Sequence, residues 1–194
     1  MKSIIALYKR YMRLITKFWV NQVTMAVLGL MVSWPLSIFI SESSNYSLFM
    51  ALSSVITAGF FCFLVYDSAN QYGLRFAVRL ASPECDLSAI PPSHAGLTIS
   101  LLAYVPTILL AILYVIFWIF PVGDAQGVMT VLLYIIPVHS MYNGLYLAVS
   151  DMASWLQPVV TVLAFLPACF FGWLGFRLGL QDKGCIVREK QSRE

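Results

Sequence analysis

The twelve Lys and Arg residues of this 194-residue chain fall in three short blocks, and long apolar stretches separate the blocks. The blocks comprise Lys2, Lys9, Arg10, Arg13 and Lys17; Arg75 and Arg79; and Arg177, Lys183, Arg188, Lys190 and Arg193. No Asp, Glu, Lys or Arg occurs in 18–41, 43–66, 95–123 or 152–176. Apolar runs of about 20 residues can cross a bilayer as helices, and Lys and Arg gather in cytoplasmic loops. The pattern predicts a polytopic membrane protein.

Composition agrees with this class. The chain is 60% hydrophobic and 11% charged, whereas soluble domains are about 25% charged. Four or five spans would use most of its length, so we expect a single membrane domain over 1–194. The net charge of +3 is explained by residues beside the spans. We therefore expect anionic lipid headgroups as partners and no nucleic acid. The four cysteines form no CxxC pair, so neither a disulfide framework nor a metal site is expected.

Residues 2–17 carry the clearest amphipathic pattern. At about 100° per residue, apolar side chains and the first basic block occupy opposite sides of a helix. We expect a helix that lies at the membrane interface with its basic side toward anionic lipid. The alternative is a cytoplasmic extension of the first span. The N-terminus is then cytoplasmic in both cases.

We expect transmembrane helices over 18–40, 46–66, 95–120 and 155–177, followed by a basic tail over 178–194. Pro35 should kink or end the last turns of the first span. The segment from Asp67 to Leu80 can continue the second span as a helix. Gly175 and Gly179 are four residues apart, which predicts close helix packing within the chain rather than dimerisation.

The remaining apolar segment, 127–150, raises a question of parity. If it crosses the membrane, the chain has five crossings and the first and last basic blocks lie on opposite sides. If it enters without crossing, four crossings leave both ends inside. Residues 137–144 contain Pro137, His139 and Gly144 and interrupt the apolar run midway. We favour a broken or re-entrant segment, with five full crossings as the alternative. The expected fold is thus an all-α polytopic transmembrane helical bundle.

Candidate ligand-binding residues lie in and after this broken segment. If it is helical, His139, Asn143 and Tyr146 share one face, and Asp151 follows at its end. An ionisable residue at membrane depth indicates a functional site, and His titrates near neutral pH. This face could hold a polar ligand or relay a proton. The alternative places His139 at the outer interface beside tyrosines.

Candidate lipid or anion contacts are Arg10, Arg13, Arg75 and Arg79. Arg75 and Arg79 are four residues apart and share a helical face that could clamp a phosphate or carboxylate. The simpler interpretation is contact with lipid phosphate beside the spans. No catalytic residue is assigned and no cofactor is expected, because GxSxG, HExxH, P-loop and paired acidic motifs are absent from the sequence.

Two stretches carry a resemblance to known proteins. An aromatic and acidic span end, Tyr66-Asp67, leads into Gly73-Leu74-Arg75, then to Pro91-Pro92 and a span containing Pro106. The last span ends in the pattern 175–179 and a basic tail. These features resemble a group of uncharacterised small polytopic membrane proteins of low-GC Gram-positive bacteria. The resemblance implies a multi-pass protein of the bacterial plasma membrane. It implies no residue role.

The function expected from these patterns is non-catalytic. We expect an accessory or substrate-capture component of a membrane transport or assembly system, working with a membrane-protein partner. Its size resembles the membrane-embedded capture subunits of vitamin importers, although those have six spans. The alternative is an intramembrane enzyme or proton-coupled carrier that uses His139.

Overall fold

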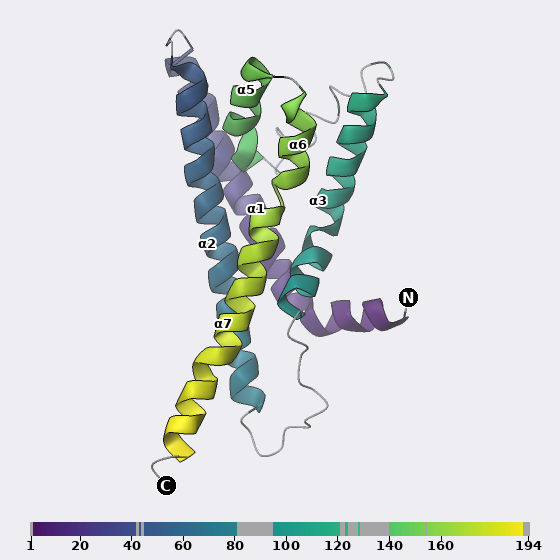
Figure 1. Ribbon diagram of the computed structural model, residues 1–194, viewed down its shortest axis with the longest axis vertical. Helices are drawn as coiled ribbons and strands as arrows, with labels where there is room; N and C mark the ends of the chain where they lie inside the picture. The colour runs from purple at the N-terminus through teal and green to yellow at the C-terminus, as the bar shows by residue number, and fades with distance from the viewer. Residues whose placement is uncertain are drawn as a thin grey trace. The chain divides into compact units, whose positions relative to one another are not determined.

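The computed structural model describes residues 2–41, 43, 45–80, 95–120, 123, 128, 140–153 and 155–191. Within these ranges, the side chains of residues 2–7, 79–80, 151–152 and 182–191 are not described. The elements are α1 (Lys2–Phe39), α2 (Tyr46–Leu80), α3 (Ala95–Ile119), the 3₁₀ helix η3 (Ser140–Tyr142), α5 (Asn143–Met152), α6 (Leu156–Leu163) and α7 (Leu166–Gln191) (Figure 1). No strand occurs among the described residues. The expected all-α helical bundle is confirmed.

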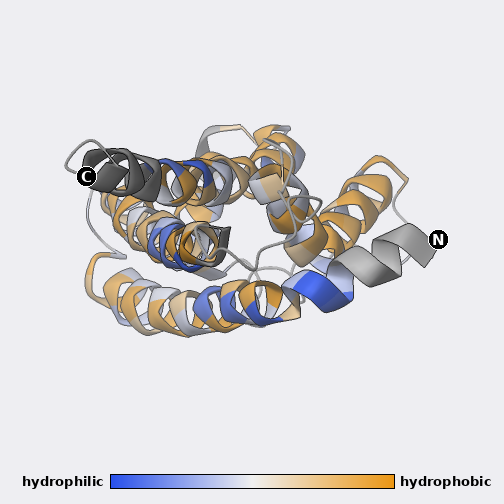
Figure 2. Cartoon of the chain, turned by 90° about the horizontal axis from the view of Figure 1, so that it is seen from below, coloured by the Kyte–Doolittle hydropathy of each residue, from blue (hydrophilic) through white to orange (hydrophobic). Residues whose placement is uncertain are grey.

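Four of the described helical stretches are long and apolar enough to cross a membrane. They are Tyr8–Phe39, Tyr46–Val78, Ala95–Ile119 and Leu156–Gln181, and each contains most of one expected span. Figure 2 shows hydrophobic residues along most of the length of the helices, with hydrophilic turns in the early part of α1. The chain is therefore a multi-pass membrane protein.

Helix boundaries differ from the expected ranges at two places. Residues 2–17 and the first span form one uninterrupted helix, which passes Pro35 and ends at Phe39. The last expected span is divided, because a turn at Ala164 and Phe165 separates α6 from α7. Pro167 explains the division: it has no N–H to donate to the carbonyl four residues earlier, and its ring clashes there. Beyond the span, α7 continues as a helix to Gln191.

The chain is organised as two compact units. Unit 1 contains Met1–Phe18, Cys62–Ala103 and Ala168–Glu194; unit 2 contains Trp19–Phe61 and Tyr104–Pro167. Each of α1, α2 and α3 contributes one segment to each unit. Along the sequence, the chain passes between the units four times, and residues 104–167 belong to unit 2 throughout.

Unit 1 has an aromatic core. On α1, Tyr11 and Phe18 are buried on the same face, at 3% and 1% exposure. The Tyr11 ring meets Tyr72 of α2 edge-on at 6.2 Å, and Tyr72 stacks on Phe176 of α7 at 6.5 Å. The apolar side of the amphipathic segment thus packs on protein. Placement of this segment at the membrane interface stays a prediction.

Glycines let α2 and α7 approach closely in unit 1. A Cβ added to Gly73 would lie 2.6 Å from the Phe176 carbonyl oxygen. A Cβ on Gly175 or Gly179 would overlap the carbonyl oxygen of Tyr66 or of Asn70. The step from Gly175 to Gly179 advances four residues along α7, and the step from Tyr66 to Asn70 advances four residues along α2. The two helices therefore run in the same direction. The expected packing of these glycines within the chain is confirmed.

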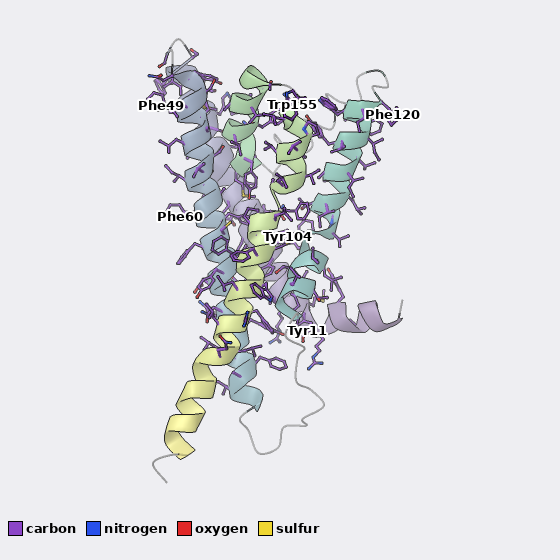
Figure 3. All side chains as sticks on the ribbon, in the orientation of Figure 1. Tyr11, Phe49, Phe60, Tyr104, Phe120 and Trp155 are labelled. Atoms are coloured by element: carbon purple, nitrogen blue, oxygen red, sulfur yellow. The ribbon has the colours of Figure 1, made fainter. Side chains whose placement is uncertain are left out.

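Unit 2 buries small residues and tyrosines. Ala26, Met50 and Ala111 are at most 1% exposed, and Tyr104 is 2% exposed. Figure 3 shows Tyr104 among the helices, whereas Phe60 of α2 points away from them and is 62% exposed. Within this unit α5 packs against α6. Large apolar side chains on the outside are expected where a helix faces lipid rather than water.

Candidate functional site: a buried polar network in unit 2

The inward face of α3 carries polar groups at two levels. Thr107 and Tyr114 are seven residues apart, which is about two helical turns, so they share one face. Thr107 is 1% exposed and Tyr114 is fully buried. Ala111 lies between them on the same face and is also buried. Two hydrogen-bonding groups therefore face the interior of unit 2 from one helix.

Tyr114 joins three elements. Its hydroxyl lies 3.2 Å from the Tyr146 hydroxyl on α5 and donates to Gln157 Oε1 of α6 at 3.5 Å. The rings of Tyr114 and Tyr146 meet edge-on, with centroids 6.4 Å apart. Gln157 lies in the first turn of α6, and its backbone carbonyl accepts a hydrogen bond from the Thr161 hydroxyl at 2.8 Å. This polar network connects α3, α5 and α6 inside an apolar unit.

A second contact links α1 to the same face of α3. Gln22 Nε2 donates to Thr107 Oγ1 at 3.0 Å, and both side chains are buried. In an apolar environment a hydroxyl or amide must find a partner within the protein. Gln22 and Thr107 supply that partner to one another across 85 residues of chain. This pair therefore joins α1 to α3, two turns from Tyr114 on the same face.

The short leg η3–α5 is held by the hydroxyl of its own first residue, which bonds to α1, and by two hydroxyls of α2. Ser140 donates to the Ala26 carbonyl of α1 at 2.6 Å, and Thr57 of α2 donates to the Met141 carbonyl at 2.8 Å. The Leu145 N–H donates to Ser54 Oγ at 3.0 Å. These bonds satisfy backbone groups at a break in regular helix, as irregular backbone at membrane depth requires.

Glycines let the leg η3–α5 pack closely against α1 and α2. A Cβ on Gly29 of α1 would lie 2.5 Å from Met141 Cα. A Cβ on Gly144 of the leg would overlap the Met50 carbonyl oxygen of α2. The leg therefore lies directly against the backbones of both helices.

The leg is too short to cross a bilayer. α5 has 10 residues, which is about 15 Å of helix against a hydrocarbon thickness of about 30 Å. Ser140 bonds to Ala26, thirteen residues or about 20 Å before the end of α1 at Phe39. After η3 the chain continues as α5, which packs against α6. Most of 127–139 lies outside the described residues, so the broken or re-entrant form of 127–150 stays a prediction.

The buried polar side chains of the described residues are uncharged. They are serines, threonines, glutamines and tyrosines, and no group of His, Cys, Asp or Glu able to hold a metal ion occurs in this part of the chain. Hydroxyls and amides can bind neutral polar groups of a ligand and can join helices. They do not supply a general base of neutral pKa.

One of the candidate ligand-binding residues predicted from the sequence belongs to this network. Tyr146 belongs to it, as described above. Asn143 begins α5 and is half-buried, but it is not among the residues of the network. Asp151 lies in the last turn of α5, and its side chain is not described. His139 lies outside the described residues.

The candidate lipid contacts all belong to unit 1. Arg10 and Arg13 are exposed on α1, and Arg75 is exposed on α2. The Arg10 guanidinium carbon lies 5.7 Å from the centroids of the Tyr11 and Phe76 rings. Arg79 lies near the end of α2, with a side chain that is not described.

Sequence reasoning missed most of the network, namely Gln22, Thr107, Tyr114 and Gln157. An ionisable residue is the usual sequence signal of a site at membrane depth, and these four residues are amides and hydroxyls. Gln22 and Gln157 could nevertheless have been recognised from the sequence, because each is an amide within a run free of charges.

No family model, no curated protein and no solved structure matches the chain.

Proposed function

We propose that this chain is a non-catalytic integral membrane protein that serves as an accessory or substrate-capture component of a membrane transport or assembly system. The observation that supports this function is the neutral polar network of unit 2. It brings hydrogen-bonding groups of α3, α5 and α6 together around Tyr114, and two turns away on the same face of α3 Thr107 accepts a hydrogen bond from Gln22 of α1. Discontinuous helices near mid-membrane form substrate sites in many transporters.

The chemistry of the network favours capture over catalysis. The residues around Tyr114 offer hydroxyl and amide groups, which bind a neutral polar ligand without changing their protonation. A hydrolase or proton-coupled carrier would need a titratable group among them. His139 remains the residue on which such a function would depend.

Both termini are proposed to face the cytoplasm, in a bacterial plasma membrane. The segments that form unit 1 contain all twelve Lys and Arg residues, and those of unit 2 contain none. A compact unit that collects every basic residue matches the cytoplasmic side under the positive-inside rule. Four crossings would leave both ends of the chain on this side.

Purification from native membranes tests the accessory role. A tagged full-length chain, extracted in mild detergent, should bring down a transport ATPase or permease in stoichiometric amount. An unrelated tagged polytopic protein of similar size is the control. If the chain repeatedly purifies alone while other membrane complexes survive the same detergent, the accessory role is wrong.

A His139→Gln variant separates the two functions. Under the proposal it keeps the partner and any transport that the assembled system supports, with an unchanged pH profile. Loss of transport, or a shifted pH profile, would favour the carrier or enzyme that depends on His139.

A further inference from the structure

One side-chain amide of unit 2 has a nitrogen without a hydrogen-bond acceptor. Gln157 is 7% exposed, and its Oε1 accepts a hydrogen bond from the Tyr114 hydroxyl at 3.5 Å. Within the described part of the chain, its Nε2 donates to no acceptor. A buried polar group without a partner costs stability, so such groups are rare in folded proteins. The two N–H groups of Gln157 therefore indicate a partner from outside the chain.

The neighbours of this amide are hydroxyls and aromatic rings. Tyr114 links Gln157 to Tyr146 of α5, and the rings of the two tyrosines meet edge-on. The Thr161 hydroxyl, one turn further along α6, donates to the backbone carbonyl of Gln157. A group that bound at Gln157 Nε2 would thus have uncharged polar and aromatic side chains beside it.

Charge determines which kind of partner fits. The segments 19–61 and 104–167 form unit 2, and they contain no Lys or Arg and three acids, Glu42, Asp124 and Asp151. A carboxylate or phosphate at Gln157 would lose its hydration without meeting a cation, which is costly. A cation would meet the N–H groups of Gln157, which are donors and repel it. An uncharged hydrogen-bond acceptor therefore fits best.

Gln157 lies close to one end of unit 2. It follows Trp155 by two residues, and Trp155 is 62% exposed at the same end of the unit as Phe120 (Figure 3). Tyr114 lies five residues, or about 8 Å, before the end of α3 at Ile119. This depth is small against a hydrocarbon thickness of about 30 Å. In the proposed topology this is the outer end, so a solute outside the cell would reach the amide first.

We propose that the Gln157 amide binds the carbonyl oxygen of an uncharged amide solute that enters unit 2 at the end carrying Trp155. This inference rests on the proposed capture function and names the substrate class of that site. A carbonyl oxygen has two lone pairs and accepts N–H groups without a change of charge. The amide carbonyl is a strong acceptor among uncharged groups. Binding would supply the acceptor that the fold does not give to Gln157 Nε2.

Saturation-transfer NMR of the full-length protein in a neutral detergent tests this site, because the method detects weak binding of small solutes. The probes are N-acetylalanine amide, which is uncharged, N-acetylalanine, which is an anion, and alanine amide, which is a cation. The uncharged probe should bind, and both charged probes should bind about tenfold or more weakly, because burial of a charge is costly. Gln157→Met should raise the dissociation constant of the uncharged probe about three- to tenfold, the effect of one lost hydrogen bond. The control is Gln71→Met on the exposed side of α2 in unit 1, which should leave it unchanged.

Three results would overturn the proposal. The first is an absence of saturation transfer to the uncharged probe. The second is equal transfer to all three probes, which would show contact with detergent or with the exposed surface. The third is an unchanged dissociation constant in Gln157→Met. If that variant does not fold, the comparison of the three probes on the unaltered protein decides.

The probe experiment and the partner experiment can fail separately. If the chain purifies alone and still binds the uncharged probe, the accessory role is wrong and the site stands. If the chain brings down a partner and binds no probe, the site is wrong and the accessory role stands.

Discussion

At the residue scale, polar side chains at membrane depth form specific pairs across helices. The Tyr114 hydroxyl meets both Tyr146 and Gln157, and Gln22 meets Thr107. In lipid the alternative to such a pair is an unsatisfied polar group, which is costly. Each pair therefore selects one arrangement of the helices that carry it.

Removing one hydroxyl tests the network at this scale. Tyr146→Phe keeps the buried ring and deletes its bond to Tyr114. We expect the free energy of unfolding to fall by about 0.5–1.5 kcal/mol, the usual range for hydrogen bonds between membrane helices. Unfolding in mixed micelles with increasing SDS measures it. The control is Tyr8→Phe on the exposed part of α1, and an equal effect of both substitutions would contradict a special role for Tyr146.

The sequence predicted only part of this network. Tyr146 was identified because it follows Asn143 at helical spacing. Tyr114 lies 32 residues from Tyr146 and 43 residues from Gln157, and no local sequence pattern relates positions so distant. Only the folded arrangement of α3, α5 and α6 brings them together.

At the scale of elements, the close approach of α2 and α7 depends on glycine. Gly175 and Gly179 of α7 face carbonyl oxygens of α2 with no room for a Cβ. Gly59, on the exposed face of α2, has no atom within 4 Å of the position that a Cβ would occupy. The same residue type is thus required at one helix surface and not at the other.

Paired alanine substitutions test this difference. Gly175→Ala would force α7 away from the Tyr66 carbonyl, and overpacking of this kind costs about 1–3 kcal/mol of unfolding free energy. Gly59→Ala should be neutral or slightly stabilising, since alanine has the higher helix propensity. Both values come from the same unfolding measurement. A Gly175→Ala variant as stable as the Gly59→Ala variant would show that α2 and α7 do not approach one another through these glycines.

Elements were more predictable than contacts. Charge-free runs predicted the positions of α1, α2 and α3, because a span must be apolar along its whole length. The spacing of Gly175 and Gly179 predicted a close approach, but not that α2 would be the neighbour. The turn at Ala164 was missed, because Pro167 lies in an apolar run and membrane helices often contain proline without breaking.

At the scale of the molecule, the three basic blocks belong to one compact unit. The chain passes between unit 1 and unit 2 four times, and the leg η3–α5 remains in unit 2. The proposed topology has four crossings and a short re-entrant leg, so both ends of the chain would lie inside. Five crossings would place Gln181 on the outer side and Ser150 on the inner side.

Labelling with a membrane-impermeant maleimide on intact cells tests the four-crossing topology most directly. Single cysteines would replace the exposed residues Asn45, Ser150 and Gln181 in a chain whose four native cysteines are changed to serine. Asn45→Cys, in the turn between α1 and α2, is the outer reference. We predict that Ser150→Cys is labelled from outside and that Gln181→Cys is labelled only after the membrane is permeabilised. The reverse pattern, with Gln181→Cys labelled on intact cells and Ser150→Cys protected, would contradict the four-crossing topology.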